Sequence, residues 1–566
     1  MSSASAAMRG TMPWRLSPCK PAGYSEDIGR HSPVYRIKLR RSVTNFRLCG
    51  YRSAIVGCIV RLIHRLDSSA PRAAATGVAL FAGALLSGCV SMAPDQETPS
   101  VVSDMPETFA AASAEPVAGA YAPQAWWTAF EDPVLDDLVE RALASNLDIA
   151  ESAARLRQAK AQARVAQSAL VPTTSASGNA SSTNSPLDGL AFGGFGGGSD
   201  RLENETYTLD LNTSYELDLF GRVRDDYRAA RQDAIASAQD LKTVQLSAAA
   251  ETITAYFDYV DAARQIALSE QTVEVLRDRA ERTDDRFTRG LADSLELYQI
   301  RQDLRSTESG LPQLRSSLVA TRSRLALLLG TYPGELDATL SQPLRPRLVF
   351  EPVPSGLPMD LLSQRPDVAA AYERLEGARL RIGARRAERF PSITLNASLG
   401  TQGGDPGSAF DFANNWATSL ASGLVAPLFD GERITANIAS ARATYDQQAA
   451  AYASAVIGAF GEVESALADY EQQRRRYALT AAQLAEAKGS LDLQSRRFEA
   501  GVGSYLSYLD ALRTVYAVET SLSSAARSTA LARLGVHRAL GGDWVEGSEP
   551  EPLEMSPAST DEREAS

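Results

Sequence analysis

Few residues of this 566-residue chain could carry out chemistry. Of its three histidines and four cysteines, only Cys89 and His537 lie beyond residue 88. No Ser-His-Asp or Cys-His set that would activate a nucleophile can be assembled around His537, which we expect to serve in packing or at the surface. The run from Gly193 to Gly198 has no following lysine, so it does not match a phosphate-binding loop. We therefore predict that the chain is not an enzyme.

Cys89 has the clearest chemical setting. The stretch from Ala73 to Gly88 is apolar and rich in small residues, follows three arginines and ends in Leu86-Ser87-Gly88-Cys89. This pattern is typical of a secretory signal. A cysteine at that point resembles the bacterial lipobox, which implies a lipid on the thiol and cleavage before it; the alternative is an ordinary buried cysteine. For residues 1–88 we predict that the start site is placed too early and that a lipoprotein signal peptide follows it. Residues 89–122 are predicted to be a lipidated tether.

Charge and cysteine content also change at this point. Cleavage before Cys89 would leave no second cysteine, and so no disulfide and no cysteine metal site. Residues 1–88 contain 13 Lys and Arg and 3 Asp and Glu; the totals of 57 and 69 then leave 44 basic and 66 acidic residues, a net charge of −22. Nucleic acid is a poor partner for such a chain, because phosphate binding needs surplus cations. Residues 543–566 are predicted to be a disordered acidic tail.

The same domain-sized unit occurs twice. The residues Asp148, Ala150, Arg155, Leu156, Ala159 and Pro172 recur 219 positions later as Asp367, Ala369, Arg374, Leu375, Ala378 and Pro391. Further on the offset is 211, and Glu251, Ala255, Tyr259, Arg286, Phe287, Gly290, Leu295, Arg322 and Gly330 recur as Glu462, Ala466, Tyr470, Arg497, Phe498, Gly501, Leu506, Arg533 and Gly541. A period above 200 residues is too long for a solenoid repeat. The change in offset indicates an insertion in the glycine-rich loop of the first copy.

Each copy predicts one long helical hairpin. Residues 222–289 contain neither Gly nor Pro and would span about 100 Å as a helix. Helices of this length are expected to pack side by side as coiled coil. Gly290 and Gly501 fall where each long helix should end, and a return helix follows each. Gly310-Leu311-Pro312 is expected to interrupt the first return helix, because proline breaks the backbone hydrogen-bond ladder.

Each copy also predicts one strand pair. From Thr206 to Phe220 apolar residues alternate almost perfectly with polar ones, which indicates a half-buried strand. Residues 392–400 repeat the pattern, the spacing of Trp416, Leu420, Leu424 and Leu428 suggests a further strand, and a weaker one runs from Thr173 to about Asn184.

These strands permit two interpretations. No apolar run beyond residue 88 reaches the ~20 residues of a transmembrane helix. Strands with one apolar face could cross a bilayer only as a closed barrel, and about eight are the usual minimum, so several chains would have to share one. A soluble sandwich, or a sheet packed on the helices, explains the alternation equally well.

Several ordered motifs between Trp126 and Gly542 resemble the TolC-like outer-membrane efflux factors, in the NodT-type lipoprotein branch that serves RND pumps. Those of the first copy are Trp126-Trp127, Phe130, Asp132, Leu135, Leu138, Ala142-Leu143, Asn146, Asp148 and Leu219-Phe220-Gly221-Arg222. Those of the second copy are residues 357–362 (LPMDLL), 365–368 (RPDV), 390–393 (FPSI) and 428–431 (LFDG).

This resemblance implies a mostly α fold with a small β part. Three chains would share a 12-stranded barrel in the outer membrane, and the hairpins would form an α-barrel across the periplasm. Residues 123–330 and 358–542 would be the two efflux repeats, with an equatorial linker at residues 331–357. The channel would be a passive exit duct without a cofactor. An adaptor (membrane fusion protein) would open it, and an inner-membrane RND pump would supply the energy.

The resemblance also implies roles for the two helix-to-helix turns. In the family these turns receive the adaptor, and here the corresponding residues are Arg286, Phe287, Gly290, Asp293, Arg497, Phe498, Gly501 and Ser504. Helix capping is the plainer alternative for Gly290 and Gly501. Asp510 would lie near a pore constriction, or else be a solvated charge on a helix. Gly503 stands where some members have an arginine of the gate, so that salt bridge cannot form here.

Two other functions stay in view. The same duct could serve type I protein secretion, although the lipobox favours drug efflux. A periplasmic coiled-coil adaptor would need a single hairpin and a compact β-rich domain, which the duplicated pattern does not predict.

Overall fold

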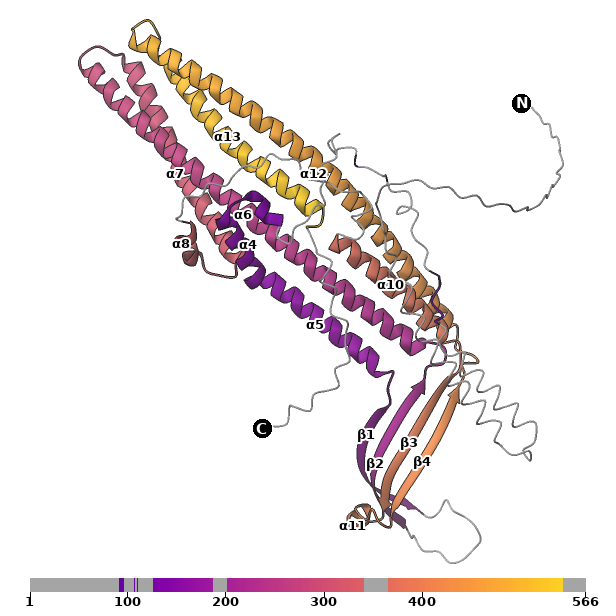
Figure 1. The fold of residues 1–566 in the computed structure, drawn as a ribbon. Coiled ribbons are helices and arrows are strands. Elements are labelled where there is room, and N and C mark those ends of the chain that lie inside the picture. The colour runs from indigo at the N-terminus through magenta and orange to yellow at the C-terminus, as the bar shows by residue number, and fades with distance from the viewer. Residues whose placement is uncertain are drawn as a thin grey trace, which may run out of the picture. The chain divides into compact units, whose positions relative to one another are not determined.

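Long helices and one small antiparallel sheet make up the structure, a computed structural model that describes residues 91–95, 106, 109, 126–186, 201–340 and 365–542. The first copy consists of η1 (Trp126–Phe130), α4 (Pro133–Ser145), α5 (Leu147–Ser168), β1 (Thr173–Pro186), β2 (Arg201–Leu217), α6 (Arg222–Thr288) and α7 (Ser294–Leu328) (Figure 1). The short η3 (Pro333–Leu336) and α8 (Asp337–Leu340) follow. The second copy consists of α10 (Pro366–Ala387), β3 (Ser392–Gly403), α11 (Pro406–Ala409), β4 (Trp416–Val425), α12 (Arg433–Glu499) and α13 (Tyr505–Ala539).

The duplication predicted from the sequence is confirmed by the lengths of the helices. The entry helices α5 and α10 have 22 residues each, the long helices α6 and α12 have 67 each, and the return helices α7 and α13 have 35 each. Both long helices follow a residue in the left-handed backbone conformation, Gly221 at φ 78° and Glu432 at φ 69°. Residues that occupy the same place in the two copies are called repeat-equivalent below.

Two helical hairpins form as predicted. Helix α6 packs on α7 and α12 packs on α13, while α10 lies against both α6 and α12 (Figure 1). The prediction of a break at Gly310-Leu311-Pro312 is wrong, because α7 continues through Pro312. Proline removes one hydrogen bond of the ladder at a cost of about 3 kcal/mol. A 35-residue helix packed along α6 has enough other contacts to absorb this loss.

The four strands form one antiparallel sheet in the order β1-β2-β3-β4. In its register Leu211 lies between Ala176 and Leu399, and Tyr215 pairs with Leu395. Because side chains alternate between faces, the apolar residues of the strands gather on one face, and Asp210, Asn212 and Glu216 share the other. The predicted alternation is confirmed, but β2 ends at Leu217 rather than Phe220. The Asp218 carboxylate accepts a hydrogen bond from the Arg224 amide at 2.9 Å, and this contact caps the start of α6.

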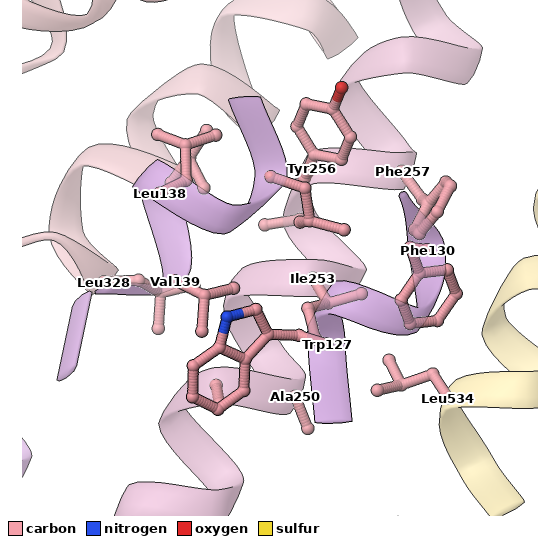
Figure 2. Close-up of a cluster of buried hydrophobic side chains, with 14 of the residues drawn as sticks. Trp127, Phe130, Leu138, Val139, Ala250, Ile253, Tyr256, Phe257, Leu328 and Leu534 are labelled. Carbon is pink, nitrogen blue, oxygen red and sulfur yellow. The ribbon is translucent and has the colours of Figure 1, made fainter. Parts of the chain in front are cut away.

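The largest apolar cluster among the described residues holds η1 against the hairpins (Figure 2). Trp127 and Phe130 pack among residues of α4, α6, α7 and α13, including the fully buried Ile253. The buried Tyr256 hydroxyl donates to Asp132 Oδ2 at 2.5 Å, and Asp132 also caps α4 by accepting the amides of Val134 and Leu135. Trp126 and Trp127 at the start of the first copy are therefore packing residues.

Among the helices that the structure describes, none is long and apolar enough to cross a membrane.

Candidate functional site: the two helix-to-helix turns

Both turns between a long helix and its return helix are capped in the same way. Gly290 has φ 69° and Gly501 has φ 71°, the left-handed conformation that glycine adopts without strain. The Leu291 amide donates to the Arg286 carbonyl at 2.7 Å, and the Val502 amide donates to the Arg497 carbonyl at 3.0 Å. A Cβ added to either glycine would meet no atom within 4 Å, so backbone conformation alone requires glycine here.

The next residues begin the return helices. Asp293 caps α7 by accepting the Leu295 amide at 3.4 Å, and the Ser504 hydroxyl caps α13 by accepting the Leu506 amide at 3.2 Å. The capping interpretation is therefore confirmed for both glycines, and a docking role at the same positions stays a prediction.

Arg286 connects the two turns within one chain. Its guanidinium donates to Glu296 Oε1 at 3.3 Å and to the Leu291 carbonyl at 3.3 Å. Its Cζ atom also lies 5.5 Å from the ring centroid of Phe498, on the other hairpin. Burial raises the pKa of Glu296, and the charge of Arg286 opposes that rise. Arg286 thus joins α6, α7 and α12 at the end of the hairpins.

Repeat-equivalent residues have different surroundings at these turns. Phe498 stacks on Tyr508 at 5.8 Å between ring centroids and packs on the cluster that contains Leu509 and Leu512. Its equivalent in the first copy, Phe287, is 41% exposed. Arg497, the equivalent of Arg286, is exposed as well.

Exposed apolar side chains gather at both turns. Leu291 is 66% exposed and its equivalent Val502 is 73% exposed; Leu295 and its equivalent Leu506 are 61% and 54% exposed. Leu291 and Val502 are not among the site residues predicted from the sequence. A usable indication was present, because an apolar residue directly after each capping glycine recurs at the 211-residue offset.

Gly503 is fixed by lack of space. A Cβ at this position would lie 2.9 Å from the Arg497 carbonyl carbon and 2.9 Å from the Phe498 amide nitrogen, closer than real Cβ contacts. The turn in this form therefore accepts no larger residue at position 503.

Asp510 lies two turns beyond Gly501, on the exposed side of α13. Its neighbour Leu509 is fully buried. No ion pair within residues 126–186, 201–340 or 365–542 involves Asp510, and its backbone carbonyl accepts the Thr514 hydroxyl at 2.8 Å. An exposed carboxylate fits either of the two interpretations of this residue.

The remaining residues with possible chemical roles are Cys89, His537 and potential metal ligands. Cys89 lies outside the described residues. His537 is 3% exposed and stacks on Trp126 with ring centroids 5.5 Å apart, so packing is confirmed and a surface position is wrong. Within the described part of the chain no three His, Cys, Asp or Glu side chains are grouped to hold a metal ion.

Two helical hairpins and a small sheet with one apolar face define a mostly α class of protein, in which the turns of the hairpins present exposed apolar residues. Residues 138–331 and 357–542 match the model of the outer membrane efflux protein family. The chain belongs to this family and is an outer-membrane efflux component.

Individual relatives agree with this assignment. The chain is 32% identical to the outer membrane protein OprJ of Pseudomonas aeruginosa over 84% of its own length and 98% of OprJ. It is 27% identical to the probable outer membrane lipoprotein SilC of Salmonella typhimurium, over 82% of its length and 97% of SilC. The solved outer-membrane channel OprN matches with a TM-score of 0.73 and 28% identity, over 80% of this chain and 99% of that one.

Proposed function

We propose that this chain forms the outer-membrane exit duct of a tripartite RND-type efflux system, a passive channel for drugs and other small molecules that an adaptor opens. The single observation that carries the proposal is the pair of repeat-equivalent turns, each ending in exposed apolar side chains. An apolar patch that a folded chain leaves in solvent indicates a binding site. The family supplies the setting of that site, an efflux protein of the outer membrane.

The duct is a homotrimer in this proposal, and the open sheet supports it. Strands β1 and β4 each have one paired neighbour, so each presents an unpaired edge. A bilayer tolerates such strands only in a closed barrel, and three copies of four strands would supply twelve.

The internal duplication indicates which residues meet between copies. Within the chain, Phe220 at the exit of the first strand pair stacks on Phe390 at the entry to the second, with ring centroids 4.6 Å apart. By the aligned motifs, the equivalents of these two residues are Phe429 and Val171, which are 94% and 57% exposed. If copies follow one another as the repeats do, Phe429 of one copy packs on Val171 of the next.

The turns lead to the same conclusion. Arg286 of the first repeat lies over Phe498 of the second, while their equivalents Arg497 and Phe287 are exposed. Continuation of the pattern places Arg497 of one copy over Phe287 of the next. The repeat-equivalent contacts at the two ends of the helices thus specify one mode of assembly.

Cysteine cross-linking tests this assembly. After processing at Cys89 the chain would contain no other cysteine, so introduced thiols can be addressed selectively. The double variant Val171→Cys/Phe429→Cys with a short bismaleimide should give covalent dimers and trimers on a denaturing gel. The matched control Phe220→Cys/Phe390→Cys should stay at monomer mass, because its two thiols lie in one chain. Monomers only from both pairs would refute the assembly.

Docking at the turns is tested separately. Gly290→Val and Gly501→Val should lower drug resistance in a strain that lacks its own duct, because a β-branched residue disfavours positive φ. Gly290→Asn and Gly501→Asn are the controls, since asparagine tolerates this conformation. Leu291→Asp/Val502→Asp should also lower resistance while the trimer remains. Resistance equal to wild type in the valine and aspartate variants would remove the docking role.

The same strain distinguishes the alternative function. A duct for type I secretion would restore export of a protein substrate and leave drug resistance low. We expect the reverse.

Acylation of Cys89 is part of the proposal. The lipobox-like pattern supports it, and SilC is named a probable outer membrane lipoprotein. Intact-mass measurement of the purified chain should show cleavage before Cys89 with added acyl mass. An unmodified cysteine at that position would refute this part alone.

A further inference from the structure

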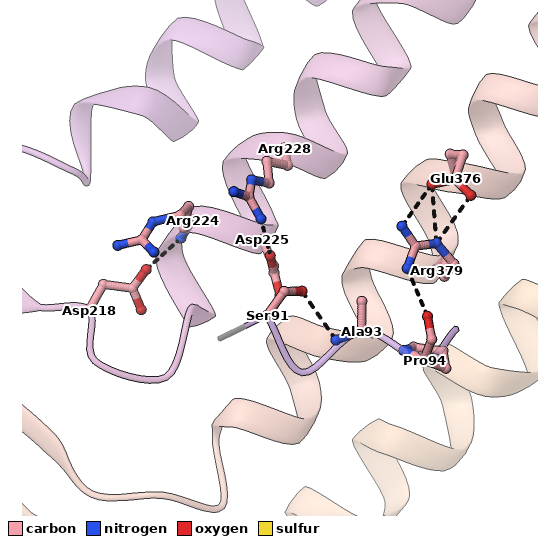
Figure 3. Close-up of polar contacts among 9 residues, drawn as sticks. All are labelled: Ser91, Ala93, Pro94, Asp218, Arg224, Asp225, Arg228, Glu376 and Arg379. Atoms are coloured by element: carbon pink, nitrogen blue, oxygen red, sulfur yellow. Dashed lines mark hydrogen bonds and ion pairs between the residues drawn. The ribbon is translucent and has the colours of Figure 1, made fainter. Parts of the chain in front are cut away.

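The first described residues of the chain are bound to the helices. Ser91–Asp95 lies along the interface between α6 and α10 (Figure 3). The segment is close to the end of these helices that adjoins the strands. Four residues separate the end of β2 from the start of α6, and β3 starts soon after α10 ends. Residues 91–95 differ from a free tether, which the sequence predicts for residues 89–122, because they have defined partners.

Four hydrogen bonds fix this segment. The Ser91 hydroxyl donates to Asp225 Oδ2 at 2.7 Å and accepts the Ala93 amide at 3.2 Å. Arg379 donates to the Pro94 carbonyl at 2.7 Å, and Arg386 donates to the Met92 carbonyl at 3.2 Å. Helix α6 thus supplies a carboxylate for the one hydroxyl of the segment, and α10 supplies two guanidinium groups for its backbone carbonyls.

The partners are themselves positioned by other residues. Asp225 is fully buried, and its second oxygen accepts from Arg228 at 3.4 Å. Burial raises the pKa of Asp225, and the hydrogen bond from Ser91 and the charge of Arg228 oppose that rise. Arg379 is oriented by Glu376, which is 7% exposed and accepts its Nε and Nη2 at 2.9–3.1 Å (Figure 3).

Gly383 provides the space for the segment. A Cβ at this position would lie 2.6 Å from the Ala93 amide nitrogen, 2.7 Å from Asp225 Oδ2 and 3.0 Å from the Ala93 Cα. Two of these three atoms belong to backbone, which cannot turn away as a flexible side chain could. Any residue larger than glycine would therefore displace the segment or the helix.

The repeat-equivalent positions of the chain do not carry this arrangement. The repeat-equivalents of Asp225 and Gly383 are Ala436 and Arg164, and those of Glu376 and Arg379 are Arg157 and Lys160. The equivalent positions on α12 and α5 thus have neither a carboxylate nor a glycine. A buried carboxylate is costly without partners, and Asp225 acquires one of its two partners from the amino-terminal segment.

We propose that the α6–α10 interface is a binding site for the chain's own amino-terminal segment, residues 91–95, built by Asp225, Gly383 and Arg379. Two residues of chain reach at most about 7 Å, so a bound segment would keep any group attached to Cys89 within about that distance of Ser91. The consequence for anchoring rests on the proposed acylation of Cys89: the acyl chains would enter the membrane beside the base of the strands instead of at the end of a free tether. Binding of the segment does not depend on that acylation.

Spin labelling tests the site in the purified full-length protein. Asp95 is exposed, and Asp95→Cys would supply the only free thiol of the processed, acylated chain. Its nitroxide spectrum should be dominated by an immobile component in the wild-type background. Gly383→Ala should convert most of that component to a mobile one, whereas the control Gly458→Ala, where an added Cβ meets nothing within 4 Å, should not.

A second pair of variants covers the case in which Gly383→Ala fails to fold. Ser91→Ala should release part of the immobile component and Ser91→Thr should restore it, because threonine retains the hydroxyl. An unchanged spectrum in both Gly383→Ala and Ser91→Ala would overturn the proposal. Drug resistance and the acyl mass are measured on the same variants, so failure of the site is distinguishable from failure of the duct function or of acylation.

Discussion

Acidification should destabilise the fold through His537. This side chain is 3% exposed, stacks on Trp126 and lies near the charge of Arg533. Burial first, and Arg533 second, lower its pKa from 6.5 to about 3. The folded chain therefore keeps His537 neutral throughout the range in which the unfolded chain takes up a proton. The contribution of His537 to the free energy of unfolding is therefore fully present above pH 6.5 and declines as the pH falls toward 3.

The size of the effect follows from the two pKa values. At pH 5.0 the unfolded histidine lies 1.5 pH units below its pKa of 6.5 and binds nearly one proton, while the folded one binds almost none. At about 1.4 kcal/mol per pH unit, the free energy of unfolding falls by about 2 kcal/mol per chain relative to pH 7.5. The variant His537→Gln cannot titrate and should lack this contribution.

Urea unfolding in detergent at pH 7.5 and pH 5.0, followed by tryptophan fluorescence, measures this difference because Trp126 lies against the histidine. Carboxylates contribute equally to both proteins, so the difference between the two pH-induced losses isolates His537. Equal losses in wild type and His537→Gln would refute the reasoning.

Three further changes have defined outcomes. Tyr256→Phe removes the donor to the buried Asp132 carboxylate and should lower the free energy of unfolding by about 1.5–3 kcal/mol in the same assay, and a loss below 0.5 kcal/mol would contradict it. Gly330→Ala should cost about 2 kcal/mol or more, because Gly330 has φ 63° and an added Cβ would lie 2.5 Å from the Ser145 carbonyl oxygen; the control Gly334→Ala, with free space, should be near neutral. Asp510→Asn should reduce the cation preference of single channels in planar bilayers if three copies form a ring of carboxylates, and unchanged selectivity would assign Asp510 to a solvated helix face.

The sequence predicted those parts of the fold that depend on local patterns. The long helix from residue 222 follows from the absence of Gly and Pro, and the sheet register agrees with the alternation from Tyr207 to Leu217. The capping of Gly290 and Gly501 follows from their positions between helical segments. Pro312 does not break α7, because the packing of the whole helix outweighs the local penalty of one proline.

Contacts between distant segments could not be predicted from the sequence. The placement of Arg286 over Phe498 joins residues more than 200 positions apart and depends on how two hairpins pack. Asp225 lies in the polar stretch Arg224-Asp225-Asp226 and gives no indication of burial, because its partner Ser91 comes from the amino-terminal segment. The burial of His537 is likewise not indicated by its own segment, because it depends on stacking with the distant Trp126.

The two repeats have diverged in charge along one helix interface. Within the chain, α6 places Asp226, Asp233 and Asp240 at heptad spacing, and they pair with Arg385, Arg381 and Arg374 of α10. The repeat-equivalents on α12 are Asn437, Thr444 and Ala451, and those on α5 are Ala166, Gln162 and Arg155. In the proposed assembly, the interface between neighbouring copies would thus contain no acid equivalent to these three aspartates.

This difference would direct α10 to its own α6 rather than to α12 of another copy, because pairing the three arginines with neutral residues would forfeit three ion pairs. Each pair is partly exposed, so its contribution is about 0.2–1 kcal/mol and is screened by salt. Asp226→Asn/Asp233→Asn/Asp240→Asn should therefore lower the free energy of unfolding by about 1–3 kcal/mol at low ionic strength, and by much less in 1 M NaCl. The control Asn437→Asp should not raise it, since Ala166 offers no cation. A loss that does not depend on salt would mean that these carboxylates act through packing instead of charge.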